Sequence, residues 1–439
     1  MPPLPPVPAE PPLIQTARWL LRPIAFMQSC RRALGETFGL QLVGFERPLY
    51  MISDPEAVRA LYTEPRHTLP PGRSASLRPM VGARSLLLLE GREHLARRRA
   101  MLPPFHGDRM RAYASIIEDA AEAEIERWPS DAAFALHPSM QAITLEVIVR
   151  AVFGVTDETR RTQLIERLRR LLDATSSPAL QFAVLLSRRV PRMDPLARVA
   201  AVRREIDALL FAEIAERRGD PDVARRDDIL SLLLGVRFED GERMDDPELR
   251  DQLMTLLLAG HETTATALAW TFDLLLRHPA ALERLTREID GGELAYLRAV
   301  IAESLRLRPV VALAGRRLVT ELQTDGVNFP PGSDVTPMIW LTHTRPDVYP
   351  EPYAFRPERF VDGAPAHYAW IPFGGGVRRC LGAAFAEFEM RVVIETVLRR
   401  CTLAAASPQA EHVTRRNVTF SPRRGTRVRL VARRDAAAR

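Results

Sequence analysis

The chain has 439 residues, of which 46% are hydrophobic, so it can bury a substantial core in one large domain or two smaller ones. This composition excludes disorder of the whole chain. The formal net charge is +6 and every basic residue is Arg, which indicates genomic compositional bias, and no nucleic-acid motif accompanies the charge.

The N-terminal segment, residues 1–12, is rich in Pro and is expected to be extended. It has no basic residue before an apolar run, and the next apolar stretch is interrupted by Arg18, Arg22 and Pro23. We therefore expect neither a signal peptide nor a membrane span. The amphipathic piece from Ile14 to Phe26 is open to two interpretations, a helix docked on the protein, which is favoured, or a helix resting on a membrane surface.

The rest of the chain predicts a predominantly helical α+β fold. Apolar residues recur at helical spacing from about Asp108 to Glu293, and short strands are expected within Leu40–Ile52 and Arg316–Thr336. No internal repeat and no long flexible linker occurs. Residues 13–439 are therefore expected to form a single large domain after the Pro-rich segment.

Basic residues gather at Arg97, Arg98 and Arg99, where they form either a solvated helix face or a surface that attracts an acidic partner. His94 and Arg98 are one helical turn apart and are expected to share a face.

A long helix is expected to begin after Asp246, which is suited to the N-cap, with Pro247 at the first helical position. It is expected to end near His278–Pro279. Its interior Gly260 costs a helix roughly 1 kcal/mol relative to Ala, which suggests a packing or functional reason. The alternative is a tolerated Gly beside exposed polar residues.

Further along, Glu303 and Arg306 are spaced three apart and therefore lie on one helix face. Such a pair alone indicates no more than a surface ion pair of little energetic value. Its importance rises because Phe355–Phe360, which includes Arg359, follows before the segment considered next.

The segment Phe373–Gly382 places Cys380 at the start of an expected helix, Ala383–Arg400. The helix dipole and free backbone amides at such a position lower the pKa of a thiol and moderate the charge of a metal-bound sulfur. The glycines allow tight turns beside a flat cofactor, and Gly382 removes a side chain where that cofactor would lie. Arg378 is available for an anionic group.

A single Cys is more often buried and inert than a ligand, as expected for Cys30 and Cys401. None of the three cysteines lies at disulfide-framework or zinc-ribbon spacing, so a reducing, cytoplasmic location is expected. Around Cys380, however, five specified positions would coincide by chance in on the order of one in ten thousand chains. These positions are Phe373, Gly376, Arg378, Cys380 and Gly382.

These residues match the Phe-x-x-Gly-x-Arg-x-Cys-x-Gly signature, and the chain resembles the soluble bacterial cytochromes P-450 over nearly its whole length. The resemblance implies the P-450 fold and haem b (iron protoporphyrin IX) with Cys380 as the proximal iron ligand. This ligand type is taken from the family, in which haem is held by a Cys thiolate. Phe373 would pack near the sulfur.

The resemblance implies further roles by position. Propionate-binding residues would be His94, Arg98, Arg316 and Arg378. Other residues close to haem would be Ala259, Gly260, Gly374 and Gly382. A structural triad would be formed by Glu303, Arg306 and Arg359.

The oxygen-binding helix of the family corresponds to the segment with Gly260, Glu262 and Thr263. Thr263 would hydrogen-bond dioxygen, and Glu262 would relay protons. The implied activity is a monooxygenase that uses O2, with electrons from NAD(P)H through a separate ferredoxin or flavodoxin and its reductase. A peroxide-dependent P-450 and a non-catalytic haem sensor or recruiting module are the alternatives.

The expected substrate is apolar, such as a fatty acid, a terpene or a related lipid, because the segments at the distal pocket of the family are apolar here. The residues expected to contact it are Leu257, Leu258, Val311, Leu313 and Phe420. Arg73 or Arg78 would anchor a carboxylate if the substrate is a fatty acid.

Overall fold

The computed structural model describes residues 3–63, 68–69, 77–105, 107, 109–176, 197–238, 241–324, 326–363, 368–416 and 418–434. Its backbone forms two compact units. Unit 1 consists of residues 1–72, 121–141 and 263–439, and unit 2 of residues 73–120 and 142–262. The chain passes between them inside helices α7 (Ala114–Ile125), α8 (Leu136–Val147) and α13 (Asp246–Arg277). One domain over residues 13–439 stays a prediction.

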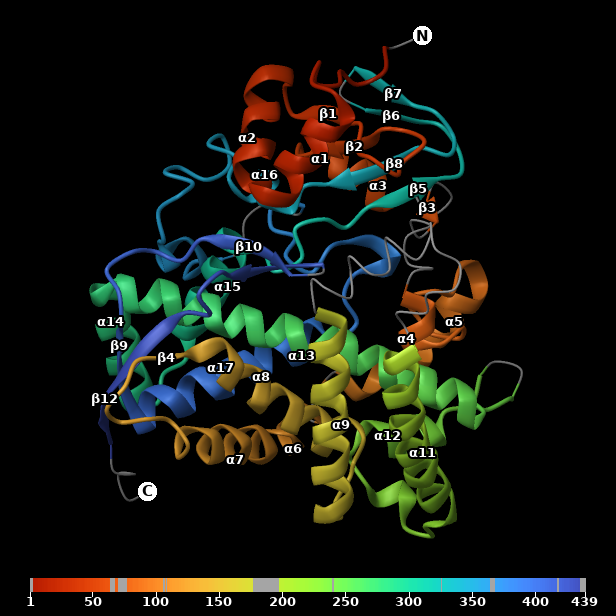
Figure 1. Ribbon diagram of the computed structural model, residues 1–439, viewed down its shortest axis with the longest axis vertical. Helices are drawn as coiled ribbons and strands as arrows, with labels where there is room; N and C mark the ends of the chain where they lie inside the picture. Colours follow the sequence, from red (N-terminus) through yellow and green to blue (C-terminus); the bar gives the residue numbers. More distant parts are fainter. Residues whose placement is uncertain are drawn as a thin grey trace. The chain divides into compact units, whose positions relative to one another are not determined.

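Unit 1 contains a five-stranded sheet in the order β1 (Thr37–Leu40), β2 (Leu49–Ile52), β8 (Asp334–Pro337), β5 (Arg316–Leu318) and β3 (Thr68–Leu69) (Figure 1). Strands β2 and β8 are parallel, and the other neighbours are antiparallel. Strands from both ends of the sequence therefore share one sheet. Strands β2, β5 and most of β8 lie in the two segments where strands were predicted, whereas β3 and all of β1 except Leu40 lie outside them.

The sheet is covered on both faces because its strands are apolar at successive positions. Side chains alternate between the faces of a strand. Met51 of β2 belongs to a core cluster with Trp19, Phe26 and Met27 from α1 (Pro12–Leu21) and α2 (Pro23–Leu34). Its neighbours Tyr50 and Ile52 belong to a second cluster with residues of α3 (Pro55–Thr63).

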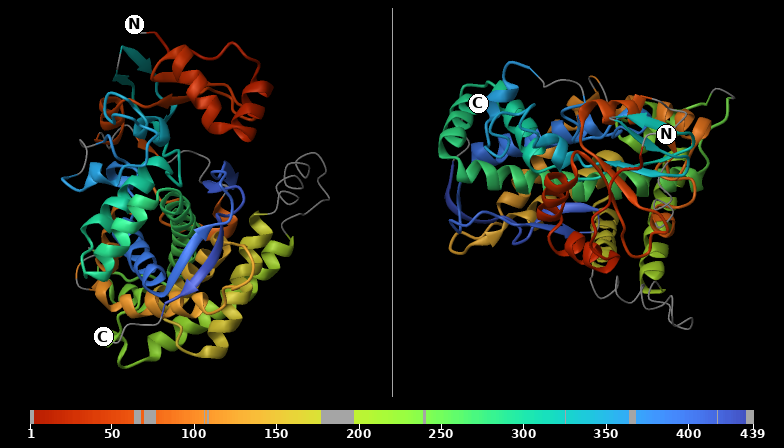
Figure 2. Two further views of the ribbon diagram at one scale, coloured as in Figure 1. Left: turned by 90° about the vertical axis from the view of Figure 1, so that its left-hand side faces the viewer. Right: turned by 90° about the horizontal axis from the view of Figure 1, so that it is seen from above.

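The remaining helices of unit 1 include three that pack together, seen as teal and blue ribbons in Figure 2. They are α14 (Pro279–Asp290), α15 (Ala295–Leu307) and α17 (Ala383–Arg400). Helix α16 (Ile339–His343) follows β8.

Smaller strand groups complete unit 1. A three-stranded sheet has the order β4 (Phe134–Ala135), β12 (Arg427–Arg433) and β9 (Cys401–Ala405). Two hairpins are formed by β6 (Leu322–Thr324) with β7 (Val327–Phe329), and by β10 (Val413–Arg416) with β11 (Thr419–Pro422).

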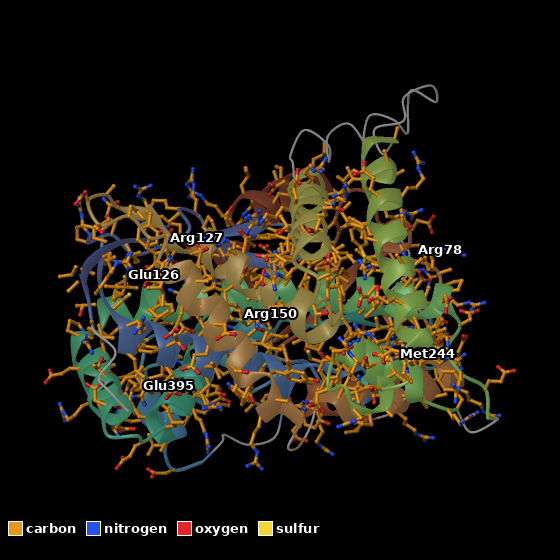
Figure 3. The ribbon with its side chains drawn as sticks, turned by 90° about the horizontal axis from the view of Figure 1, so that it is seen from below. Arg78, Glu126, Arg127, Arg150, Met244 and Glu395 are labelled. Carbon is orange, nitrogen blue, oxygen red and sulfur yellow. The ribbon has the colours of Figure 1, made fainter. Side chains whose placement is uncertain are left out.

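Unit 2 is helical in the part that the structure describes. Besides its shares of α7, α8 and α13 it contains α4 (Arg78–Val81), α5 (Gly91–Met101), α6 (Arg109–Ala112), α9 (Glu158–Ser176), α11 (Ala197–Gly219) and α12 (Ile229–Gly235). Helices α9 and α11 lie side by side (Figure 1). Helix α8 continues as a π-helical segment, Ile148–Val152, in which Arg150 (labelled in Figure 3) pairs with Asp119 at 3.0 Å.

A buried ionic group in unit 2 has no counterpart in the sequence analysis. Arg217 is 2% exposed and donates to Asp228 Oδ2 at 2.6 Å, to Glu213 Oε1 at 2.5 Å and to Gly154 O at 2.9 Å. Its full set of acceptors offsets the cost of burying its charge.

Helix α13 was predicted with nearly the right ends, but its N-cap is corrected by one residue. The side chain of Asp245, not that of Asp246, accepts from the backbone N–H of Glu248, at 2.8 Å. An N-cap side chain bonds the amide two or three residues on, and Asp245 is the residue at that distance.

Two further predictions can be compared directly with the fold. The predominantly helical α+β class is confirmed. Residues 3–11 form neither helix nor strand, and α1 begins at Pro12. None of the described helices combines the length and the hydropathy needed to cross a membrane.

Candidate functional site

The loop before α17 folds back on itself. The N–H of Cys380 donates to Phe373 O at 2.9 Å, the N–H of Arg379 donates to Gly376 O at 3.0 Å, and Cys380 is exposed. Helix α17 spans Ala383–Arg400, as predicted, and its N-cap is Gly382, so Cys380 lies two residues before the cap.

The glycines of this loop are required by space and by backbone conformation. A Cβ on Gly375 would stand 2.4 Å from Tyr62 Cδ2, and one on Gly376 would stand 2.2 Å from Tyr62 O. Gly376 also has a φ of +64°, which side chains disfavour. Helix α3, which carries Tyr62, therefore fixes the path of the loop. By contrast, a Cβ on Gly382 would meet nothing within 4 Å, which agrees with a flat group lying beside it.

Arg316, at the start of β5, carries a buried charge beside this loop. It is 7% exposed and donates to three carbonyl oxygens, those of Ala314, Gly315 and Gly375, at 3.2, 2.9 and 3.1 Å. Burial lowers the pKa of its guanidinium, while nearby Tyr62 opposes the shift. Among the described residues no carboxylate pairs with Arg316, so the site suits an acidic group of a ligand, such as a haem propionate.

His343 is hydrogen-bonded to the segment that leads into the Cys380 loop. Its Nε2 accepts from the N–H of Ile371 at 2.8 Å, so the neutral ring carries its proton on Nδ1 and donates to Arg306 O at 3.2 Å. Burial and the charge of Arg306 lower the pKa of His343 to about 3, so the ring is neutral at physiological pH. The sequence analysis missed this residue, because a lone His carries no spacing signal.

The structure brings the three residues of the expected triad together. Glu303 and Arg306 have no exposed side-chain surface and are joined by bonds of 2.6 and 2.8 Å, and Arg359 Nε lies 3.5 Å from Glu303 Oε1. Arg306 also donates to the carbonyl oxygens of His343 and Pro352, at 2.8 and 2.7 Å. This buried network ties α15 to the segments that lead to the Cys380 loop.

In unit 2, α5 places His94 and Arg98 on one face, His94 buried and Arg98 half-buried. The neighbouring Arg97 is held by Glu248 at 2.9 Å and stacks on the ring of Phe238 at 3.9 Å. Arg97 is therefore committed to unit 2 and is not part of a simple solvated face.

The middle of α13 is an uninterrupted helix that contains Gly260, Glu262 and Thr263, all half-buried, while Ala259 is exposed. A Cβ on Gly260 would meet Ile148 Cδ1 at 3.5 Å, an ordinary contact. Packing among the described residues therefore does not require a glycine here, which favours a functional reason for it.

The expected substrate contacts differ in burial. Val311, Leu313 and Leu258 are half-buried, whereas Leu257 is 0% exposed. Phe420 lies in the core cluster of α1 and α2, with its ring 6.3 Å from Trp19, so packing alone accounts for its burial.

The two arginines considered as carboxylate anchors also differ. Arg78 is exposed at the start of α4 (Figure 3). Arg73 lies outside the described residues.

A comparison with protein families finds one that covers almost the whole chain. The family described as Cytochrome P450 matches residues 2–425. Among curated proteins, cytochrome P450 135B1 of Mycobacterium tuberculosis is 41% identical over 449 residues, which cover 99% of this chain and 93% of that protein. Cytochrome P450 138 of Mycobacterium bovis is 38% identical, with 97% of each chain covered.

Solved structures resemble this fold over similar lengths. Retinoic acid bound cyanobacterial CYP120A1 has a TM-score of 0.84 and 27% identity, covering 98% of this chain and 99% of that one. The heme domain of cytochrome P450DA has a TM-score of 0.86 with 99% and 98% covered, and at 23% identity it bears on the fold alone.

Proposed function

Since the chain belongs to the cytochrome P450 family and is therefore a haem monooxygenase, we propose that it inserts one oxygen atom from O2 into an apolar lipid, such as a fatty acid or a terpene, with electrons from separate redox partners. The observation that carries the site assignment is the exposed Cys380 in a loop whose Gly375 carbonyl accepts from buried Arg316, an arginine that has no carboxylate partner among the described residues. Cys380 would hold the iron, and Arg316, Arg378, His94 and Arg98 would bind the propionates.

Bound haem supplies the oxidation chemistry, and a thiolate ligand favours cleavage of the O–O bond. The chain's own contribution is to hold the thiolate, orient the substrate and deliver protons. The Thr263 hydroxyl would donate a hydrogen bond to dioxygen, and the Glu262 carboxyl would pass protons toward it. The two residues are adjacent on α13 and half-buried, which supports this role.

Replacing Thr263 with Ala or Glu262 with Gln is expected to leave haem bound but to divert reducing equivalents to peroxide. General acid catalysis contributes about 10² to 10⁴ in rate, so product formed per reductant consumed is expected to fall at least about tenfold. The measurement is product against NADPH consumed. Thr264→Ala, the adjacent threonine, is the control and should keep normal coupling. Wild-type coupling and rate in both test variants would remove the pair from the proton-relay role.

The substrate proposal rests on the apolar, half-buried side chains of Leu258, Val311 and Leu313. Similarity to a protein described as retinoic acid bound adds support, because that ligand joins an apolar chain to a carboxylate. Apolar pockets bind by area burial, with a few polar groups that fix orientation.

Titration of the ferric protein with long-chain fatty acids, their methyl esters and neutral terpenes is expected to give haem spectral shifts at micromolar ligand. If an arginine anchors the carboxylate, the acid binds more tightly than its ester, and Arg78→Gln or Arg73→Gln removes that difference. Equal affinities for acid, ester and terpene would favour a neutral substrate. Tight binding of small polar ligands alone would contradict the proposal.

The electron source is proposed to be a ferredoxin or flavodoxin with an NAD(P)H-dependent reductase. Turnover with such a pair under O2 separates this proposal from the alternatives. A peroxide-dependent enzyme would turn over with peroxide and gain nothing from the redox pair. A haem sensor would bind haem and oxidise none of the ligands.

A further inference from the structure

Helix α1 turns its apolar side outward. Leu13 and Leu21 are 73% and 80% exposed, and Ile14 and Leu20 are 49% and 53% exposed. On the opposite side Gln15 is buried, at 1% exposed. A docked amphipathic helix normally buries its leucines and exposes its amides, so α1 has the reverse orientation.

The orientation of α1 is fixed by its polar and aromatic anchors. Gln15 Nε2 donates to the carbonyl oxygens of Pro8 and Glu10 at 3.2 and 2.7 Å, and its Oε1 accepts from the N–H of Gln41 at 2.9 Å. Trp19, 4% exposed, packs on Phe420. The helix cannot roll to bury its leucines without breaking three hydrogen bonds.

The exposed side chains form one continuous stripe. At 100° per residue, positions 13, 14, 17, 20 and 21 fall within an arc of about 120°. We call this stripe the α1 face: Leu13, Ile14, Ala17, Leu20 and Leu21. Val43, 51% exposed, adjoins it, because its N–H donates to Thr16 Oγ1 at 2.9 Å.

Among the described residues, four exposed large hydrophobic side chains belong to the α1 face: Leu13, Ile14, Leu20 and Leu21. Among the described residues, half of the exposed large hydrophobic side chains lie within the first 43 residues, a tenth of the chain. Exposed leucines that gather in this way mark an interaction surface, whereas scattered ones do not.

The segment that carries the α1 face is rich in arginine. Residues 11–35 contain four arginines and no acidic residue. Arg18 binds Glu10 and Ser29, which leaves it committed to the protein. Arg22, which directly follows Leu21 at the junction of α1 and α2, is exposed.

We propose that the α1 face docks on the surface of an anionic phospholipid bilayer, with its leucines at the acyl boundary and Arg22 among the headgroups. An interfacial helix of this kind binds through buried apolar area together with attraction of basic residues to anionic lipid. This proposal goes beyond the oxidation chemistry. It places the protein where apolar substrates partition, and it holds or fails independently of which substrate is oxidised.

The test uses the full haem-loaded chain and sedimentation with vesicles of phosphatidylcholine, alone or mixed with phosphatidylglycerol. The variant Leu13→Gln/Leu20→Gln/Leu21→Gln is expected to bind the mixed vesicles at least about tenfold more weakly, because three leucines no longer enter the bilayer. Arg22→Gln is expected to weaken that binding roughly fivefold and to leave binding to pure phosphatidylcholine unchanged.

A matched control replaces three exposed valines elsewhere in unit 1, Val319→Gln/Val361→Gln/Val431→Gln, and should bind like the wild type. Retention of the haem spectrum in every variant shows that the fold is intact. Equal binding by the leucine and valine variants would overturn the proposal. So would a wild-type dimer in light scattering that ignores vesicles and that the leucine variant converts to a monomer, because the face would then join two copies of the chain.

Discussion

Replacement of Cys380 by alanine is expected to abolish completely the red-shifted carbon-monoxide band of the ferrous haem protein. This band requires a thiolate ligand, and Cys380 is the exposed cysteine of the chain, held in a loop that α3 and His343 keep in place. The arginines proposed to bind the propionates remain, so some haem should still bind without the thiolate spectrum. The measurement is the absorption difference spectrum after reduction and addition of carbon monoxide.

The other two cysteines supply the control. Cys30 and Cys401 are buried, and burial raises the pKa of each thiol to about 11, which disfavours the thiolate. Cys30→Ala and Cys401→Ala should therefore keep the band. If either control lost it while Cys380→Ala retained it, the ligand assignment would be wrong.

The change Glu303→Gln is expected to lower the free energy of unfolding by about 3–5 kcal/mol, because it leaves the buried charge of Arg306 without its counterion. Both side chains of this pair are 0% exposed, and Arg359 loses the same partner. Chemical denaturation followed by circular dichroism measures the loss. Because Arg306 O receives the hydrogen bond from His343, a loosened Cys380 loop and faster haem loss should accompany it.

A matched control for this prediction is Glu56→Gln. Glu56 pairs with Arg59 at the same three-residue spacing and at 2.8 Å, but the two side chains are 72% and 57% exposed. An exposed pair is worth roughly 1 kcal/mol or less, so the control should be nearly neutral. Equal losses in both variants would show that burial of the Glu303 pair has no special energetic role.

Local spacing explains which parts of the site could be predicted from the sequence. The Cys380 loop carries several specified residues within ten positions, and Glu303 and Arg306 share one helix turn, so both stood out before any fold was known. Arg359, the third residue of the triad with Glu303 and Arg306, was predicted because its motif lies between that pair and the Cys380 loop in the sequence.

Contacts between distant segments could not be predicted in this way. Tyr62 leaves no room for a side chain at Gly375 or Gly376, although some 300 residues of sequence separate them. The ring of His343 accepts a hydrogen bond from the backbone N–H of Ile371. Neither contact leaves a pattern in the sequence. The outward orientation of α1 was equally hidden, because it depends on the partners that Gln15 finds in other segments. The favoured docked-helix interpretation was right about the contact with the protein but did not foresee an exposed apolar side.

The strand order of the five-stranded sheet in unit 1 affects how the protein folds during translation. Strand β2 pairs with its neighbour β1 and with β8, Leu49 opposite Asp334, so one edge of this apolar strand stays unpaired in the growing chain until β8 has been translated. At roughly 5–20 residues per second, that delay is on the order of tens of seconds. The residues of unit 2 have all been made once Glu262 has been added, whereas unit 1 needs residues from the last strand, β12. The first two strands to be synthesised can thus pair with each other early, whereas their sheet is completed only late in translation.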